Sequence, residues 1–144
     1  MGKSKSFTNA VEQWTEQVHQ ASLDTFAESV RGIANEARAA MPHETGNLSR
    51  SIVVSDTAAI PLGANDEVYP DPAASDDAVL ANLKLGDRVY IGSRATYFNK
   101  QEFGWLSVAG GAVTSHSGRF GMTAAMARWS AVVKRVWSRR RREG

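Results

Sequence analysis

The sequence of 144 residues contains no cysteine, and this absence excludes several classes of site. Without thiols there is no cysteine nucleophile, no disulfide framework, no iron-sulfur cluster and no zinc centre built on sulfur. No run of residues approaches the roughly 18 apolar positions that a transmembrane helix requires, and the opening MGKSKSFTNAVEQW lacks the apolar core of a signal peptide. We therefore expect a protein that neither spans a membrane nor is secreted by that route, with no membrane partner.

An excess of one charge is also missing, because 17 Lys and Arg residues stand against 15 Asp and Glu residues. The resulting net charge of +2 does not by itself indicate a nucleic-acid-binding protein. Evidence for or against nucleic-acid binding must come from how the charges are distributed along the chain. That distribution is uneven. Residues 56–87 hold seven acids and one base, whereas residues 128–142 hold seven bases and no acid.

The N-terminal part of the chain has the apolar spacing of an amphipathic helix. Over residues 9–41 apolar side chains recur every three or four positions, with one step of five. Asn9 and Glu12 have the spacing of an N-terminal cap, and Pro42 predicts the stop. A helix of more than thirty residues exceeds the diameter of a domain of this size, so it must bend near Gly32 or project at one end.

A second amphipathic stretch lies near the C-terminus. From Met122 to Trp137 the apolar positions follow the i, i+3, i+4, i+7 pattern of a helix, which ends in a run of arginines. Basic residues are favourable there, at the negative end of the helix dipole. Trp129 and Trp137 share one helical face with Val133, which favours a role as core or interface anchors over base stacking.

Between these helices the sequence predicts short strands and loops. The expected elements are a strand over residues 48–55, a long acidic surface loop or hairpin arm over 56–87, a strand over 88–92, one or two helical turns within 95–105 that end at Gly104, and a glycine-rich loop over 107–118.

This order of elements predicts one α+β domain over residues 1–144. A small antiparallel sheet packs against the long N-terminal helix and the C-terminal helix, with a long inserted loop. Residues 1–7 are expected to be a flexible N-terminus, and residues 138–144 a basic tail.

Nothing in the sequence favours catalysis. His19, His43 and His116 do not stand at metal-binding spacings from one another, and no phosphate-binding glycine motif is present. The acid pairs at Asp66 and Asp76 lie in the acidic loop, where solvent should keep both carboxylates ionised. We expect no catalytic residue, no metal, no cofactor and no enzymatic activity.

The arginine run is the sharpest electrostatic feature, and it consists of Arg139, Arg140, Arg141 and Arg142. Such a run can bind phosphates, which would make the affinity for nucleic acid depend on salt. Alternatively it is a solvated face or contacts acidic groups on a protein partner or a neighbouring copy, for which the 56–87 segment is a candidate. The sequence leaves both interpretations open.

Two further segments are informative together. Residues 42–52 read PHETGNLSRSI, and residues 97–104 read YFNKQEFG. The first resembles the P-x-x-TG-x-L-x-x-SI segment, and the second is similar to the YA-x-x-x-EFG segment, of the head-tail connector, or tail-completion, proteins of long-tailed bacteriophages and prophages. A loop, Gly118, Phe120 and a closing helix then follow in the order typical of that family.

The resemblance implies a virion structural protein of the phage neck, which forms a ring, typically a hexamer, that completes the tail and joins it to the head. It implies as partners further copies of itself, adjoining neck or head-completion proteins, the tail tube or tail terminator protein, and transient DNA in the lumen. The implied location is the virion neck, and the host cytoplasm during assembly. The motif and interface residues carried over are Thr45, Gly46, Leu48, Ser51, Ile52, Tyr97, Glu102, Phe103 and Gly104. The alternative function is a small nucleic-acid-binding module that uses the arginine run.

The first motif also has a direct physical interpretation. Gly46 permits a positive φ, so it can turn the chain from helix into strand. On such a strand Leu48 and Ile52 would share the face that meets the core, and Ser51 would point the opposite way, toward solvent or a neighbour.

In the second motif, Glu102 stands in an apolar setting, and a carboxylate buried alone is costly. We therefore expect it to pair with a base such as Arg50 or Arg94. The acidic and the glycine-rich loops are expected to order only on contact with adjoining ring proteins.

Overall fold

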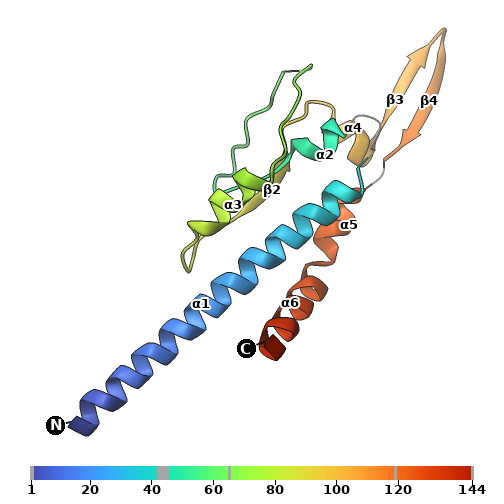
Figure 1. The fold of residues 1–144 in the computed structure, drawn as a ribbon. Coiled ribbons are helices and arrows are strands. Elements are labelled where there is room, and N and C mark those ends of the chain that lie inside the picture. Colours follow the sequence, from blue (N-terminus) through green and yellow to red (C-terminus); the bar gives the residue numbers. More distant parts are fainter. Residues whose placement is uncertain (1, 42–45, 65, 119, 144) are drawn as a thin grey trace.

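The computed structural model of the protein describes residues 2–41, 46–64, 66–118 and 120–143, and it has the expected mixed α+β architecture. The elements in order are α1 (Gly2–Ala39), α2 (Asn47–Ser51), β1 (Ile52–Ser55), α3 (Ala73–Ala81), β2 (Tyr90–Ser93), α4 (Phe98–Phe103), β3 (Gly104–Ala109), β4 (Ala112–Ser117), α5 (Gly121–Ala127) and α6 (Trp129–Glu143). The helix α1 lies in the middle, with β1, β2 and α3 on one side and α5 and α6 on the other (Figure 1). Among the described residues, no helical segment combines the length and the apolar composition that a membrane span requires.

The helix α1 is a single unbroken element that begins at Gly2, not at Asn9 as the capping pattern predicted. Residues 2–7, expected to be flexible, therefore belong to the helix. No proline or glycine occurs between residues 3 and 31, so nothing in the backbone stops the helix from extending beyond the cap signal. With 38 residues, α1 is about 57 Å long at 1.5 Å per residue. Of the two predicted outcomes, bending or projection, its N-terminal half projects (Figure 1).

The glycine within α1 serves close packing. A Cβ atom at Gly32 would lie 3.3 Å from Cγ1 of Val132 on α6, so the missing side chain lets the two helices approach. The core surrounds this C-terminal half of α1. It consists of two adjoining clusters, the first with Ile33, Ala37, Met41, Leu48, Ile52, Tyr69, Ala95, Ala125, Val132 and Val136, and the second with Val30, Ala34, Val54 and Leu80.

The predicted strand over residues 48–55 is wrong in its first half. Residues 47–51 form the short helix α2, and the strand β1 begins at Ile52. The reason is that Gly46, with φ of 70°, turns the chain directly into a helical turn that buries Leu48. Strand β1 then pairs with β2 in antiparallel register, from Ile52 opposite Ser93 to Ser55 opposite Tyr90.

The acidic segment 56–87 is not a hairpin arm that waits for a partner. It contains α3, and it returns Tyr69, Asp76 and Leu80 to the protein interior. Asn47 holds the segment through its side chain, because its amide donates to the carbonyl of Glu67 at 2.9 Å and its oxygen accepts the N–H of Tyr69 at 2.8 Å. Contacts within the chain therefore order this segment.

The glycine-rich stretch over residues 107–118 is also not a loop. Strands β3 and β4 form an antiparallel hairpin in which Gly104 lies opposite Ser117 and Ala109 opposite Ala112. The turn falls on Gly110 and Gly111, whose φ values of 58° and 80° are both positive, as a two-residue hairpin turn of type I′ requires. The hairpin extends away from the body (Figure 1).

The C-terminal helical stretch is divided into two helices. Helix α5 ends at Ala127, Arg128 breaks the regular helix, and α6 continues to Glu143. Residues 138–143, expected to be a tail, therefore form the last turns of α6.

Candidate assembly interface

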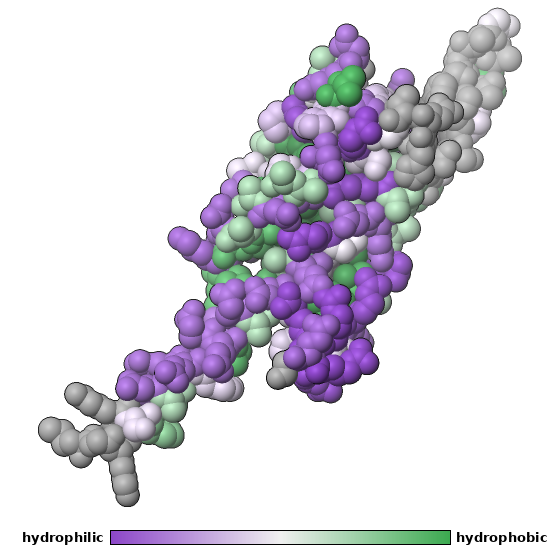
Figure 2. All heavy atoms as spheres, in the orientation of Figure 1, coloured by the Kyte–Doolittle hydropathy of each residue, from purple (hydrophilic) through white to green (hydrophobic). Residues whose placement is uncertain are grey.

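The projecting half of α1 carries a row of exposed apolar side chains, which we call the arm stripe: Phe7, Val11, Trp14 and Val18. Phe7 is 72% and Trp14 is 64% exposed. Because the steps along the stripe are four, three and four residues, the four side chains fall within about 60° around the helix. Figure 2 shows apolar residues on this arm among mostly hydrophilic ones.

The arm stripe is not a simple extension of the face that α1 turns toward the core. At 3.6 residues per turn the stripe lies about 100° away from the face that contains Ile33 and Ala37. It instead continues the line of Thr25 and Gly32, where α1 is covered by α6. The single step of five in the apolar spacing, between Ala21 and Phe26, marks this change of face. The stripe therefore continues, past the end of α6, the face of α1 that α6 covers.

A groove of about 370 Å³ lies where the arm leaves the body, between α1 and the end of α6. Trp137, which is 47% exposed, borders it together with Ala21 and Thr25. The hydroxyl of Thr25 is buried and has no hydrogen-bond partner within the part of the chain that is described. Trp137 thus adds exposed aromatic surface near the base of the stripe.

The arginine run contacts acids of its own chain. Arg139 and Arg140 both form ion pairs with Glu28 on α1. The distance between Arg140 and Glu28 is 2.8 Å. Arg128 reaches Glu36 at 3.0 Å in the same way. The acidic surface that the bases meet is therefore α1, and not the 56–87 segment that the sequence suggested.

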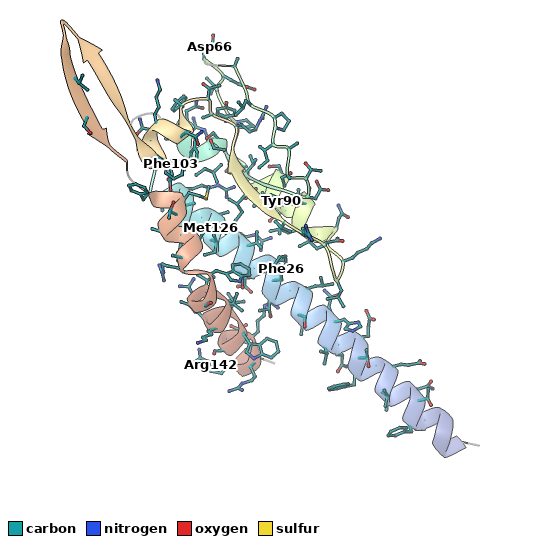
Figure 3. The ribbon with its side chains drawn as sticks, turned by 180° about the vertical axis from the view of Figure 1, so that it is seen from behind. Phe26, Asp66, Tyr90, Phe103, Met126 and Arg142 are labelled. Carbon is teal, nitrogen blue, oxygen red and sulfur yellow. The ribbon has the colours of Figure 1, made fainter. Side chains whose placement is uncertain are left out.

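The other two arginines differ. Arg141 and Arg142 are exposed, and among the described residues neither makes an ion pair, although Arg141 borders the groove between α1 and α6. Arg142 lies at the free end of α6 (Figure 3). Half of the run is thus paired with acids of α1.

The first motif maintains the fold. Thr45 lies outside the described residues. Leu48 and Ile52 are buried in the core cluster that Tyr97 of the second motif also contacts. Ser51 is completely buried, which contradicts its expected outward direction, because its hydroxyl donates to the carbonyl of Leu48 at 2.6 Å and bonds the hydroxyl of Ser93 at 2.7 Å.

The prediction that Glu102 forms an ion pair with Arg50 or Arg94 is wrong. Its carboxylate is 1% exposed and caps the N-terminus of α5, where it accepts the N–H of Met122 at 3.1 Å and both the N–H and the hydroxyl of Thr123 at 2.7 and 2.9 Å. A carboxylate is favourable at the positive end of a helix. The two predicted partners contact the acidic segment instead: Arg50 donates to the carbonyl of Tyr69, and Arg94 lies 3.6 Å from Glu67.

Glu67 and Arg94 also lie near the hydroxyl of Tyr69. This hydroxyl donates a hydrogen bond to the backbone carbonyl of Arg94 at 2.9 Å. Burial and then the Glu67 carboxylate raise the pKa of Tyr69, and the Arg94 guanidinium partly opposes them.

The remaining motif residues mark the base of the hairpin. Gly104 ends α4 with φ of 86° and starts β3, as its predicted position required. Phe103 is exposed and packs edge-to-face on Phe120, with ring centroids 6.0 Å apart. Figure 3 places Phe103 at this point, beside α5 and the hairpin. The pair offers a second aromatic surface, far from the arm.

Sequence reasoning missed one buried ion pair. Asp76 was expected to be solvated, yet it is 1% exposed and lies 2.6 Å from Arg38 of α1. The same carboxylate accepts the N–H of Val54 at 3.2 Å, and Arg38 also donates to the carbonyl of Ile52. The pair borders a polar cleft of about 380 Å³. No local signal separates Asp76 from its exposed neighbour Asp77.

Within the described ranges, no group of three His, Cys, Asp or Glu side chains could hold a metal ion. His19 is exposed on the arm, and His43 lies outside the described residues. No protein-family model, no curated protein and no solved structure matches the chain.

Proposed function

We propose that the protein is a virion structural subunit of the neck of a tailed bacteriophage. It assembles with further copies into a ring that completes the tail and joins it to the head, and it performs no catalysis. The observation that carries this proposal is the shape of the subunit: the arm and the β3–β4 hairpin project from opposite ends of a small body (Figure 1). The resemblance of residues 42–52 and 97–104 to connector proteins supports the same function.

The hairpin suits contact with an adjoining neck, head or tail protein. A two-stranded hairpin is marginally stable by itself, and its outer strand edges present backbone groups that another chain can pair with. Val113 on β4 is exposed, as is the aromatic pair at the hairpin base. We therefore assign the hairpin to the contact with a different neck component.

This assignment predicts that shortening the hairpin abolishes attachment. A variant with residues 106–115 replaced by Asn-Gly keeps the pairs at the base of the hairpin and the type of turn that joins them. We expect the native protein to sediment with purified tail tubes or portal-bearing heads and to form a ring there in electron micrographs. The variant should keep its circular dichroism spectrum and bind at least tenfold more weakly. Binding of the native protein to neither particle would contradict the proposed function.

The alternative, a nucleic-acid-binding module, makes a different prediction for the arginine run. Because Arg139 and Arg140 already contact Glu28, the charge available to phosphates is reduced. Truncation after Ser138 should therefore change the affinity for double-stranded DNA less than twofold, measured by fluorescence anisotropy at two salt concentrations. A loss of tenfold or more that weakens with added salt would favour the alternative function.

A further inference from the structure

We propose that the arm stripe is a binding site for the arm of a second copy of this chain, which lies antiparallel to the first. The stripe consists of Phe7, Val11, Trp14 and Val18, and all four are exposed in the single chain. Their heptad spacing is that of a seam between two helices. The inference concerns the protein before attachment, and it does not rest on the proposed neck function.

The charges of the arm indicate a protein occupant. Lys3 and Lys5 precede the stripe, and from residue 6 to residue 23 the arm holds two acids and no Lys or Arg, so no basic group lies along the stripe for nucleic acid or anionic lipid to bind. The two acids of the projecting part, Glu12 and Glu16, lie more than about 120° around the helix from the stripe. Thr8, Thr15 and Gln17 flank it, so along residues 7–18 a second helix meets no like charge beside the apolar contact.

The order of the side chains indicates that the occupant is a second copy. In an antiparallel pair, Phe7 lies opposite Val18 of the partner subunit, and Val11 lies opposite Trp14 of the partner subunit. Twofold symmetry repeats both layers, so that every layer combines one aromatic ring with one valine. A parallel pair would instead place ring on ring and valine on valine, and its layers would differ in thickness.

The stripe is exposed beyond the part of α1 that α6 covers. Arg140 of α6 approaches Asp24 at 3.8 Å, and the groove that Arg140 and Arg141 border reaches Gln17. From Val18 to Phe7 the apolar side chains of the stripe are exposed in the single chain.

The test compares two single substitutions that add the same charge to the arm. Val11→Glu places a carboxylate in the stripe, whereas Gln13→Glu places it on another face of the same helix. Both positions are exposed in the single chain, so both variants should keep the circular dichroism spectrum of the native protein. In light scattering over a concentration series, we expect the native protein and Gln13→Glu to reach twice the mass of one chain. Val11→Glu should remain at one.

Orientation can be tested because the chain has no cysteine of its own. The Val11→Cys and Trp14→Cys proteins should form a disulfide dimer on oxidation when they are mixed, and much less when either is alone. Disulfides of Val11→Cys with itself would overturn the antiparallel arrangement. A native mass of one chain at every concentration, or an assembly that Val11→Glu leaves intact, would overturn the proposed site. Neither result bears on binding to tails or heads, which is measured separately.

Discussion

Replacing Asp76 with alanine should lower the free energy of unfolding by about 3–5 kcal/mol, the usual cost of removing one partner from a buried ion pair. Its carboxylate joins three elements, because it lies on α3, contacts Arg38 of α1 and accepts the N–H of Val54 in β1. Without this carboxylate, the guanidinium of Arg38 stays buried beside the methyl group of the new alanine, and the backbone N–H of Val54 loses its acceptor. Chemical denaturation, followed by circular dichroism, measures the effect.

The neighbouring residue provides the control. Asp77 pairs with Arg31 at 2.6 Å, but both side chains are largely exposed, and such pairs contribute about 0–1 kcal/mol. Asp77→Ala should therefore lower the free energy of unfolding by less than about 1 kcal/mol. Adding Arg38→Met to Asp76→Ala should recover part of the loss, because it removes the unpaired buried charge. Equal losses in the free energy of unfolding for Asp76→Ala and Asp77→Ala would contradict the claim that the buried pair stabilises the fold more than the exposed pair.

Glu102→Ala should lower the free energy of unfolding by about 2–3 kcal/mol, since hydrogen bonds to a buried charged group contribute this much. The substitution removes the acceptor of three hydrogen bonds at the start of α5 and leaves the N–H groups of Met122 and Thr123 without it. Denaturation by urea is again the measurement.

Two further variants separate capping from simple loss of charge. Glu102→Gln keeps one acceptor oxygen at the cap, so it should be less destabilising than the alanine variant. Glu16→Ala removes a carboxylate from the exposed arm and should change the free energy of unfolding by less than about 0.5 kcal/mol. If Glu102→Ala were as mild as Glu16→Ala, the cap would not stabilise the fold.

These two carboxylates show where sequence reasoning reached its limit. The sequence correctly marked Glu102 as a buried acid that needs partners, because its neighbours are aromatic and apolar. It did not identify those partners, since backbone N–H groups of a distant helix leave no signature in side-chain identity. For Asp76 even the burial was missed, because an acidic, proline-containing segment has the composition of a surface loop.

By itself the sequence determined the elements whose signals are local. Apolar spacing predicted α1 and the closing helical stretch, the glycine in the EFG motif predicted the end of α4, and the order of elements predicted the α+β class. The spacing also contained the arm stripe, including the step of five that separates it from the core face. Periodicity records which side chains share a face, and it needs no knowledge of what covers that face.

Only the tertiary structure decided which faces are covered. It shows that Arg140 of α6 approaches Asp24 while the arm stripe stays exposed, that Arg139 and Arg140 pair with Glu28, and that the acidic segment packs on α1. Each of these outcomes joins residues that lie far apart in the chain. Such pairings are selected by the packing of the whole domain and by the cost of leaving charges unpaired, which no single segment encodes.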